Sequence, residues 1–227
     1  MQTPPFYSEV RSLTVYDPLA EFLGAAENGR FEYRYIDAVK LAGHSCPTVA
    51  AAYWMTLKAL ATLYPDSLPE RGGIRVEFRQ DRLSGVTGVI ANVVAMLTGA
   101  THDTGFKGIG GRFDRRQLLY FSADVADEIR FTRLDTGQAV DVAARLQGVP
   151  FVPGTSELMQ KCLDGSTTSQ ETSEFRENWQ ARVRALLLDH GDDAEVAALT
   201  PHRQVAIRGY VTEANDRASA GRGCWRS

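Results

Sequence analysis

The sequence has 227 residues, 44% of them hydrophobic and 23% charged, with a formal net charge of -3, which suits a globular protein with one substantial core or two small ones. The acidic balance argues against nucleic acid as the main partner. No apolar run reaches the roughly 18 residues of a membrane span, and residues 1–13 lack the basic and apolar regions of a signal peptide, so we expect a cytoplasmic protein.

The first part of the chain is predicted to alternate short helices and one strand. Asp17 and Pro18 carry the signals of a helix start, which predicts a helix over 19–26. The alternating aromatic segment 31–35 favours a strand, and a second helix is expected over 36–42.

The central part is predicted to supply the core. Residues 47–64 are expected to form a helix with proline at its first position, and its middle is apolar on nearly all sides. Residues 74–79 alternate as a strand that buries every second side chain. Residues 87–97 are expected to form a second apolar helix whose small residues allow close packing. We therefore expect two buried helices packed against each other.

The remaining segments define the fold class. Strands are predicted at 116–123 and 128–134, and a helix at 136–146. Helices but no strand are expected later in the chain, at 173–190 and 201–219. The predicted fold is α+β, a small antiparallel sheet packed on buried helices with a helical C-terminal extension. The domains are expected at 16–150 and 155–227.

One short segment carries the strongest chemical signal. His44 and Cys46 stand one residue apart at the start of the central helix, directly before Pro47. In an extended approach two such side chains can reach one zinc ion. The helix dipole and the free amides of the first turn favour the thiolate of Cys46.

The motif and its surroundings resemble the E-subunit family of formylmethanofuran dehydrogenase. The resemblance spans 37–121 and rests on the order of its motifs, which are the Gly-His-Ser-Cys-Pro segment, an alanine-rich helix, a strand, a helix ending in Leu-Thr-Gly-Ala-Thr, and a glycine-rich loop before Tyr120 and Phe121. It implies a metal-associated α+β protein, usually a homodimer, with a divalent metal at His44 and Cys46. Val89 and Asn92 stand where that family typically has a cysteine and an aspartate, so its usual ligand set is incomplete here.

A third ligand has to come from elsewhere, since a typical catalytic zinc site uses three protein ligands. His102, after the second buried helix, is the candidate third ligand. Asp103 is the candidate carboxylate that would accept a hydrogen bond from it or contribute to the site. Asn92 and Tyr53 are candidate pocket residues. Cys224 is an alternative extra ligand, whereas Cys162 is expected in the core.

Two other chemistries stay open at Cys46. A thiolate before proline also serves as an axial ligand of haem, in which case Tyr53, Trp54, Met55 and Phe106 would line the pocket. A thiol enzyme with His44 or His102 as base would use the same residue types.

The glycine-rich loop offers a separate binding hypothesis. A glycine-rich hairpin connection is the leading interpretation, and the backbone amides with two flanking cations make an anion-binding loop the alternative. The residues concerned are Lys107, Gly108, Gly110 and Arg112. The leading expectation for the whole protein is a zinc-binding homodimer, as an enzyme or an accessory protein, with room for a small-molecule ligand and no contact with nucleic acid or membrane.

Overall fold

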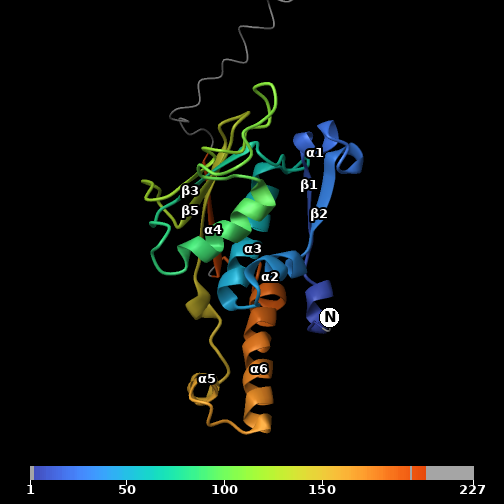
Figure 1. The fold of residues 1–227 in the computed structure, drawn as a ribbon. Coiled ribbons are helices and arrows are strands. Elements are labelled where there is room, and N and C mark those ends of the chain that lie inside the picture. Colours follow the sequence, from blue (N-terminus) through green and yellow to red (C-terminus); the bar gives the residue numbers. More distant parts are fainter. Residues whose placement is uncertain (1–2, 195, 203–227) are drawn as a thin grey trace, which may run out of the picture.

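The computed structural model describes residues 3–194 and 196–202. Its main sheet has five strands, two of which, β3 and β5, are labelled in Figure 1. The strand order is β4-β3-β5-β6-β7, and every neighbouring pair is antiparallel except β3 and β4. The strands are β3 (Ile74–Phe78), β4 (Leu119–Tyr120), β5 (Ile129–Arg133), β6 (Ala139–Ala144) and β7 (Ala197–His202). The α+β class is confirmed. The main sheet is larger than predicted and mixed rather than antiparallel.

Three helices form the core together with this sheet. They are α2 (Tyr35–Ala42), α3 (Pro47–Leu63) and α4 (Thr87–Thr98). α3 packs on the sheet, and α2 packs against α3 and α4. Most side chains of α3 are buried, as its apolar sequence predicts, and they meet buried residues of α4 and of β3, β5 and β6. The two close-packed helices of the prediction are therefore α3 and α4.

The N-terminal segments form a smaller layer beside the core. A two-stranded antiparallel sheet pairs β1 (Leu13–Tyr16) with β2 (Arg30–Tyr33). The short helices η1 (Pro5–Ser8), α1 (Pro18–Phe22) and η2 (Glu27–Gly29) flank it. The predicted helix at 19–26 therefore ends earlier than expected. The side chain of Asp17 caps α1 by accepting hydrogen bonds from the amides of Leu19 and Ala20.

The predicted helix at 136–146 is wrong, because this segment forms a strand. The turn after β5 leads into β6, where Val140 and Val142 face the core. Asp141, on the other face, is fully buried and accepts two hydrogen bonds from Arg130, at 2.6 and 2.7 Å. Alternating valines bury one face of a strand, and this period of two overrides the alanines that favoured a helix.

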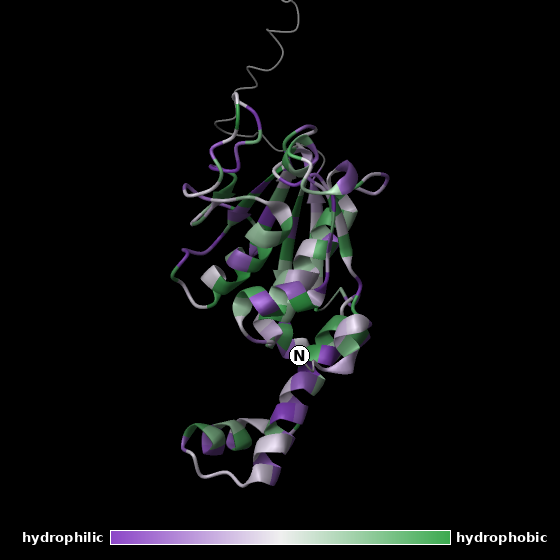
Figure 2. Cartoon of the chain, turned by 45° about the vertical axis from the view of Figure 1, so that its right-hand side comes forward, coloured by the Kyte–Doolittle hydropathy of each residue, from purple (hydrophilic) through white to green (hydrophobic). Residues whose placement is uncertain are grey.

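The C-terminal part is helical, but it also returns to the sheet. The helices α5 (Thr155–Leu163) and α6 (Ser169–Arg184) form an arm below the body of the protein, and Figure 2 shows α6 as largely hydrophilic and α5 as mixed. The π-helical turn η4 (Ala185–Asp189) extends α6. β7 then pairs with β6, so the prediction of no strand here is wrong.

The remaining predicted segments differ from the observed elements in type or length. The predicted helix at 201–219 is wrong for 201–202, which belong to β7, and the rest of it lies outside the described residues. The predicted strand at 116–123 shrinks to the two residues of β4, and a short helical turn, η3 (Leu146–Gly148), follows β6. Within the described residues, every helix is too short or too polar to cross a lipid bilayer.

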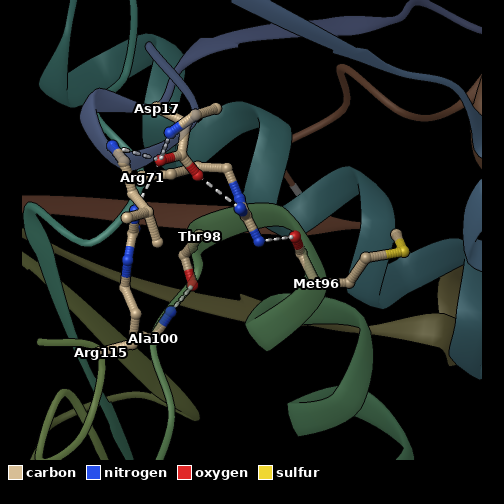
Figure 3. Close-up of polar contacts among 8 residues, drawn as sticks. Asp17, Arg71, Met96, Thr98, Ala100 and Arg115 are labelled. Atoms are coloured by element: carbon tan, nitrogen blue, oxygen red, sulfur yellow. Dashed lines mark hydrogen bonds and ion pairs between the residues drawn. The ribbon is translucent and has the colours of Figure 1, made fainter. Parts of the chain in front are cut away.

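A buried ionic cluster joins the N-terminal layer to the end of α4 (Figure 3). Asp17 accepts a hydrogen bond from Arg71 at 2.7 Å and one from Arg115 at 2.6 Å. Arg71 also donates to the carbonyl of Met96 in the last turn of α4, at 2.9 Å. One carboxylate therefore holds two guanidinium groups from distant parts of the chain.

Candidate functional site at the His-Ser-Cys-Pro turn

The candidate site is the turn between α2 and α3. Gly43 ends α2 in the left-handed conformation, with a φ of 75°, and its amide donates to the carbonyl of Val39. Cys46 is the N-cap of α3, and Pro47 occupies the first helical position. The sequence signals thus position the motif at a helix start, as predicted.

Cys46 is half-buried and presents its sulfur to the first turn of α3. Its Sγ accepts a hydrogen bond from the amide of Val49 at 3.5 Å, within the range for sulfur, and its side chain packs against the main core. The sulfur thus lies at the N-terminus of α3, on the side of the turn where the motif begins the helix. The position leaves Cys46 able to act as a ligand.

His44 is exposed, and one of its ring nitrogens is already engaged. Its Nδ1 lies 3.0 Å from the carbonyl oxygen of Ala42. A carbonyl can only accept, so Nδ1 carries the proton in this hydrogen bond and Nε2 keeps a free lone pair. Histidines that bind metals commonly have this arrangement, in which a backbone carbonyl fixes the tautomer.

Ser45, between the two candidate ligands, anchors the turn to α6. Its Oγ donates to Gln180 Oε1 at 3.2 Å and lies 2.9 Å from the hydroxyl of Tyr35. Because Gln180 Oε1 is an acceptor, the single hydroxyl proton of Ser45 is used there, and Tyr35 donates to Ser45. Burial raises the pKa of Tyr35, which keeps this donor protonated.

α6 makes further contacts with the same residue. Trp179 Nε1 donates to the carbonyl of Ser45 at 3.0 Å, and Gln180 Nε2 approaches that carbonyl at 3.4 Å. The hydroxyl of Tyr7, on η1, also donates to Gln180 Oε1, at 3.2 Å. The turn is thus tied both to the N-terminal helix η1 and to α6.

Sequence reasoning missed Ser45, Tyr35 and Gln180 as residues of the site. Gln180 lies 135 positions after Ser45, and a glutamine on a polar helix gives no signal of its partner. Two features of the sequence could have indicated these contacts, namely the aromatic residue Tyr35 before the motif and Trp179 beside Gln180.

His102, the predicted third ligand, lies beyond the other end of the neighbouring helix. It follows the C-terminus of α4, is exposed, and its Nδ1 lies 3.2 Å from Asp103 Oδ1. The His102 hydrogen bond lowers the pKa of Asp103. The two residues lie together near Phe121, and the ring centroids of His102 and Phe121 are 6.1 Å apart.

The other predicted pocket residues are dispersed. Asn92 is exposed on α4, and Tyr53 is fully buried in α3, where its hydroxyl donates to the carbonyls of Arg11 and Tyr33. Trp54 is buried, with its Nε1 donating to the carbonyl of Gly191. Phe106 is 43% exposed on a loop, so the aromatic residues expected around a haem point to different surroundings.

The glycine-rich loop forms a hairpin. Ile109 and Arg112 exchange two backbone hydrogen bonds, at 2.9 and 3.0 Å, with Gly110 and Gly111 at positive φ between them. The amides of Ile109 and Arg112 are therefore engaged within the loop. Lys107 and Gly108 precede the hairpin, and the Arg112 guanidinium lies over the ring of Phe113. The anion-binding role of this loop stays a prediction.

The two remaining cysteines do not join the turn in the described part of the chain. Cys162 is half-buried on α5, a helix whose only buried residue is Thr155, so it is not in the core as predicted. Cys224 lies outside the described residues. Within 3–194 and 196–202, no three side chains of histidine, cysteine, aspartate or glutamate gather as a metal cluster.

The fold and the turn together define a class of α+β protein in which a His-x-Cys-Pro segment begins a buried helix. The family model described as "FmdE, Molybdenum formylmethanofuran dehydrogenase operon" matches residues 41–193, more than half of the chain. The chain therefore belongs to the FmdE family, as the resemblance implied. The match includes both the turn and the helix α6 that holds Ser45. A comparison with curated proteins gives no match.

Proposed function

We propose that this protein binds a transition metal ion, with zinc as the first candidate, through Nε2 of His44 and Sγ of Cys46. The observation that carries the proposal is the hydrogen bond from Nδ1 of His44 to the carbonyl of Ala42, because it leaves Nε2 free as a ligand on an exposed side chain. Membership of the FmdE family supports a metal-related role.

The chemistry of the donor pair fits the metal. Imidazole nitrogen and cysteine sulfur are both usual zinc ligands, and Sγ of Cys46 lies at the first turn of α3. Two protein donors leave further positions for water, a small ligand or another side chain. A metal bound there would act as a Lewis acid towards such a ligand.

The remaining residues of the turn position the two donors. Ser45 is held by Tyr35 and by Gln180, so the backbone on both sides of it is fixed. Such outer contacts commonly change metal affinity by about 10–100-fold when removed. Gln180→Ala is accordingly expected to weaken metal binding without removing a ligand.

Elemental analysis of the purified protein tests the proposal. We expect about one zinc per chain, lost in Cys46→Ala and strongly reduced in His44→Ala. Cys162→Ser is the matched control, because it removes a half-buried thiol from α5. Loading with Co²⁺ is expected to give a thiolate charge-transfer band that Cys46→Ala abolishes.

Three outcomes would overturn the proposal. These are metal retained in full by Cys46→Ala, no metal bound by the folded wild type even after reconstitution, and a Soret band in place of zinc, which would establish the haem alternative. We also propose that the protein is a homodimer, and light scattering on the same sample tests this, with the mass of a single chain as the contrary result.

A further inference from the structure

A cavity of about 290 Å³ lies on the side of α3 that faces the sheet and the start of α4. Its inner wall includes Met55, Phe78 and Ile129, whose side chains are buried in the main core. The cavity opens to solvent at its rim, where Val86 is 52% exposed. It approaches the volume of pockets that hold small molecules.

The cavity is separate from the His-Ser-Cys-Pro turn. Thr48, Ala51 and Met55 line it from α3, whereas His44 and Cys46 do not. Cys46 instead lies near Tyr35 and contacts the amide of Val49. A ligand of the cavity would therefore not need the metal, and the inference does not depend on the proposed function.

The polar groups of the cavity define the charge of its ligand. The polar lining side chains are Thr48, Gln80, Ser84, Thr87 and Glu128, and no lysine or arginine is among them. Glu128 Oε2 accepts one hydrogen bond, from the amide of Ala144 at 3.4 Å. Within the described residues no cation forms an ion pair with Glu128, so its carboxylate has capacity for a positively charged partner.

The rim at the loop before α4 combines polar and apolar groups. Val86, which is 52% exposed, lines the cavity beside Gln80, Ser84 and Gly85. The apolar inner wall and the one carboxylate together describe a site for a molecule with a hydrophobic body and a cationic end.

We propose that this cavity binds a small amine with an aromatic or aliphatic ring, with the ring between Met55, Phe78 and Ile129 and the ammonium group at Glu128. An anion of the same shape would meet the carboxylate and be rejected. A neutral analogue would bind through its ring alone and therefore more weakly.

Benzylamine is the probe, with benzyl alcohol and benzoate as its neutral and anionic analogues. Titrations of isotope-labelled full-length protein are followed by NMR, so that shifts map to residues. We expect benzylamine to shift resonances of the cavity lining, benzyl alcohol to bind more weakly, and benzoate not to bind. Glu128→Gln removes one charge-assisted hydrogen bond and is expected to weaken benzylamine binding about tenfold. Its affinity for benzyl alcohol is expected to stay within about twofold of that of the wild type.

Two variants complete the test. Ala144→Phe is expected to fill the cavity and abolish binding of both ligands, since Ala144 is part of its lining. Glu157→Gln, on the distant α5, is the matched charge control and is expected to leave benzylamine binding unchanged. The NMR spectrum of each variant reports its fold independently.

Several results of these titrations would contradict the amine-binding proposal. The proposal fails if benzylamine causes no shifts in the cavity, if benzoate binds as tightly, or if Glu128→Gln weakens both ring compounds equally. It also fails if the cavity resonances shift with protein concentration rather than with amine, because that result would assign the cavity to a second copy of the chain.

Discussion

Arg115 donates a hydrogen bond of 2.6 Å to Asp17, across 98 positions of the sequence, and both side chains are buried. The same carboxylate accepts from Arg71 and caps α1. Two guanidinium groups thus share one buried carboxylate. In the described part of the chain Arg115 Nη1 and Arg71 Nε are buried without a hydrogen-bond partner, so the charge of Asp17 is the main compensation at this point.

Asp17→Ala is therefore expected to destabilise the protein strongly. It leaves the buried Arg115 and the half-buried Arg71 without their carboxylate and removes the cap of α1, and breaking a buried pair costs about 3–5 kcal/mol. Urea unfolding measures the loss. Asp114→Ala is the matched control, because Asp114 pairs with Arg116 at 2.7 Å on the exposed surface, where a pair contributes about 0–1 kcal/mol. Equal costs for the two variants would contradict the role of the cluster.

The same carboxylate predicts a pH dependence of stability. Burial alone would raise the pKa of Asp17, but attraction to Arg115, the hydrogen bond from Ala20 and contact with Arg71 together bring it below its ordinary value of 3.8. The native state then binds the proton less readily than the unfolded chain. The contribution of Asp17 is therefore complete above the ordinary pKa and is lost as the pH falls through the lower native value.

Urea unfolding from pH 7 down to pH 3 checks this dependence. We expect the difference in unfolding free energy between the wild type and Asp17→Asn to stay constant at neutral pH and to narrow only in the acid range. A difference that already declines between pH 7 and pH 5 would assign the titration to another group.

A glycine beside the cluster gives a third prediction. Gly72 has a φ of 82°, and a Cβ added there would lie 2.2 Å from Nη1 of Arg115. Gly72→Ala is expected to cost more than Gly24→Ala, because Gly24 has a similar φ of 65° but no atom within 4 Å of an added Cβ. The control isolates the backbone strain of about 1 kcal/mol, and steric displacement of Arg115 adds about 1–3 kcal/mol. Thermal unfolding of both variants gives the comparison, and equal melting temperatures would refute it.

The anchoring of the turn gives a fourth prediction. Trp179→Phe keeps an aromatic ring next to Phe151 and Phe175 but loses the donor to the carbonyl of Ser45. We expect a loss of about 0.5–1.5 kcal/mol and faster hydrogen exchange of the amides around Cys46. Ser173→Ala, which removes an exposed hydroxyl from the same helix, is the control. Unchanged exchange at the turn would show that α6 does not hold it.

Much of the core could be predicted from the sequence because its signals are local. Pro47 and an apolar run indicate α3, and the alternation of Ile74, Val76 and Phe78 indicates β3. β6 was missed because a short run rich in alanine and valine satisfies both periods, and pairing with β5 decides between them. β7 was missed because it contains Pro201, which a strand tolerates only at an edge such as this one.

The candidate site was predicted only in part, because some of its contacts join residues that are distant in sequence. His44 and Cys46 are close in sequence, so their common position at the start of α3 follows from a helix signal. The contact between Ser45 and Gln180 is a property of the folded chain and leaves no local trace. The position of His102 after the second buried helix does not indicate which way the following loop turns, and in the structure His102 lies near Phe121.

The position of β7 also bears on how the chain is made. β6 is complete at Ala144, but in the described part of the chain its outer edge pairs with residues from Ala197 onward, which leave the ribosome after the whole α5–α6 arm. Until then the nascent sheet exposes unpaired backbone groups of β6, a template for misassembly with other chains. A stalled or prematurely terminated product that ends before Ala197 would thus carry this open edge into the cell.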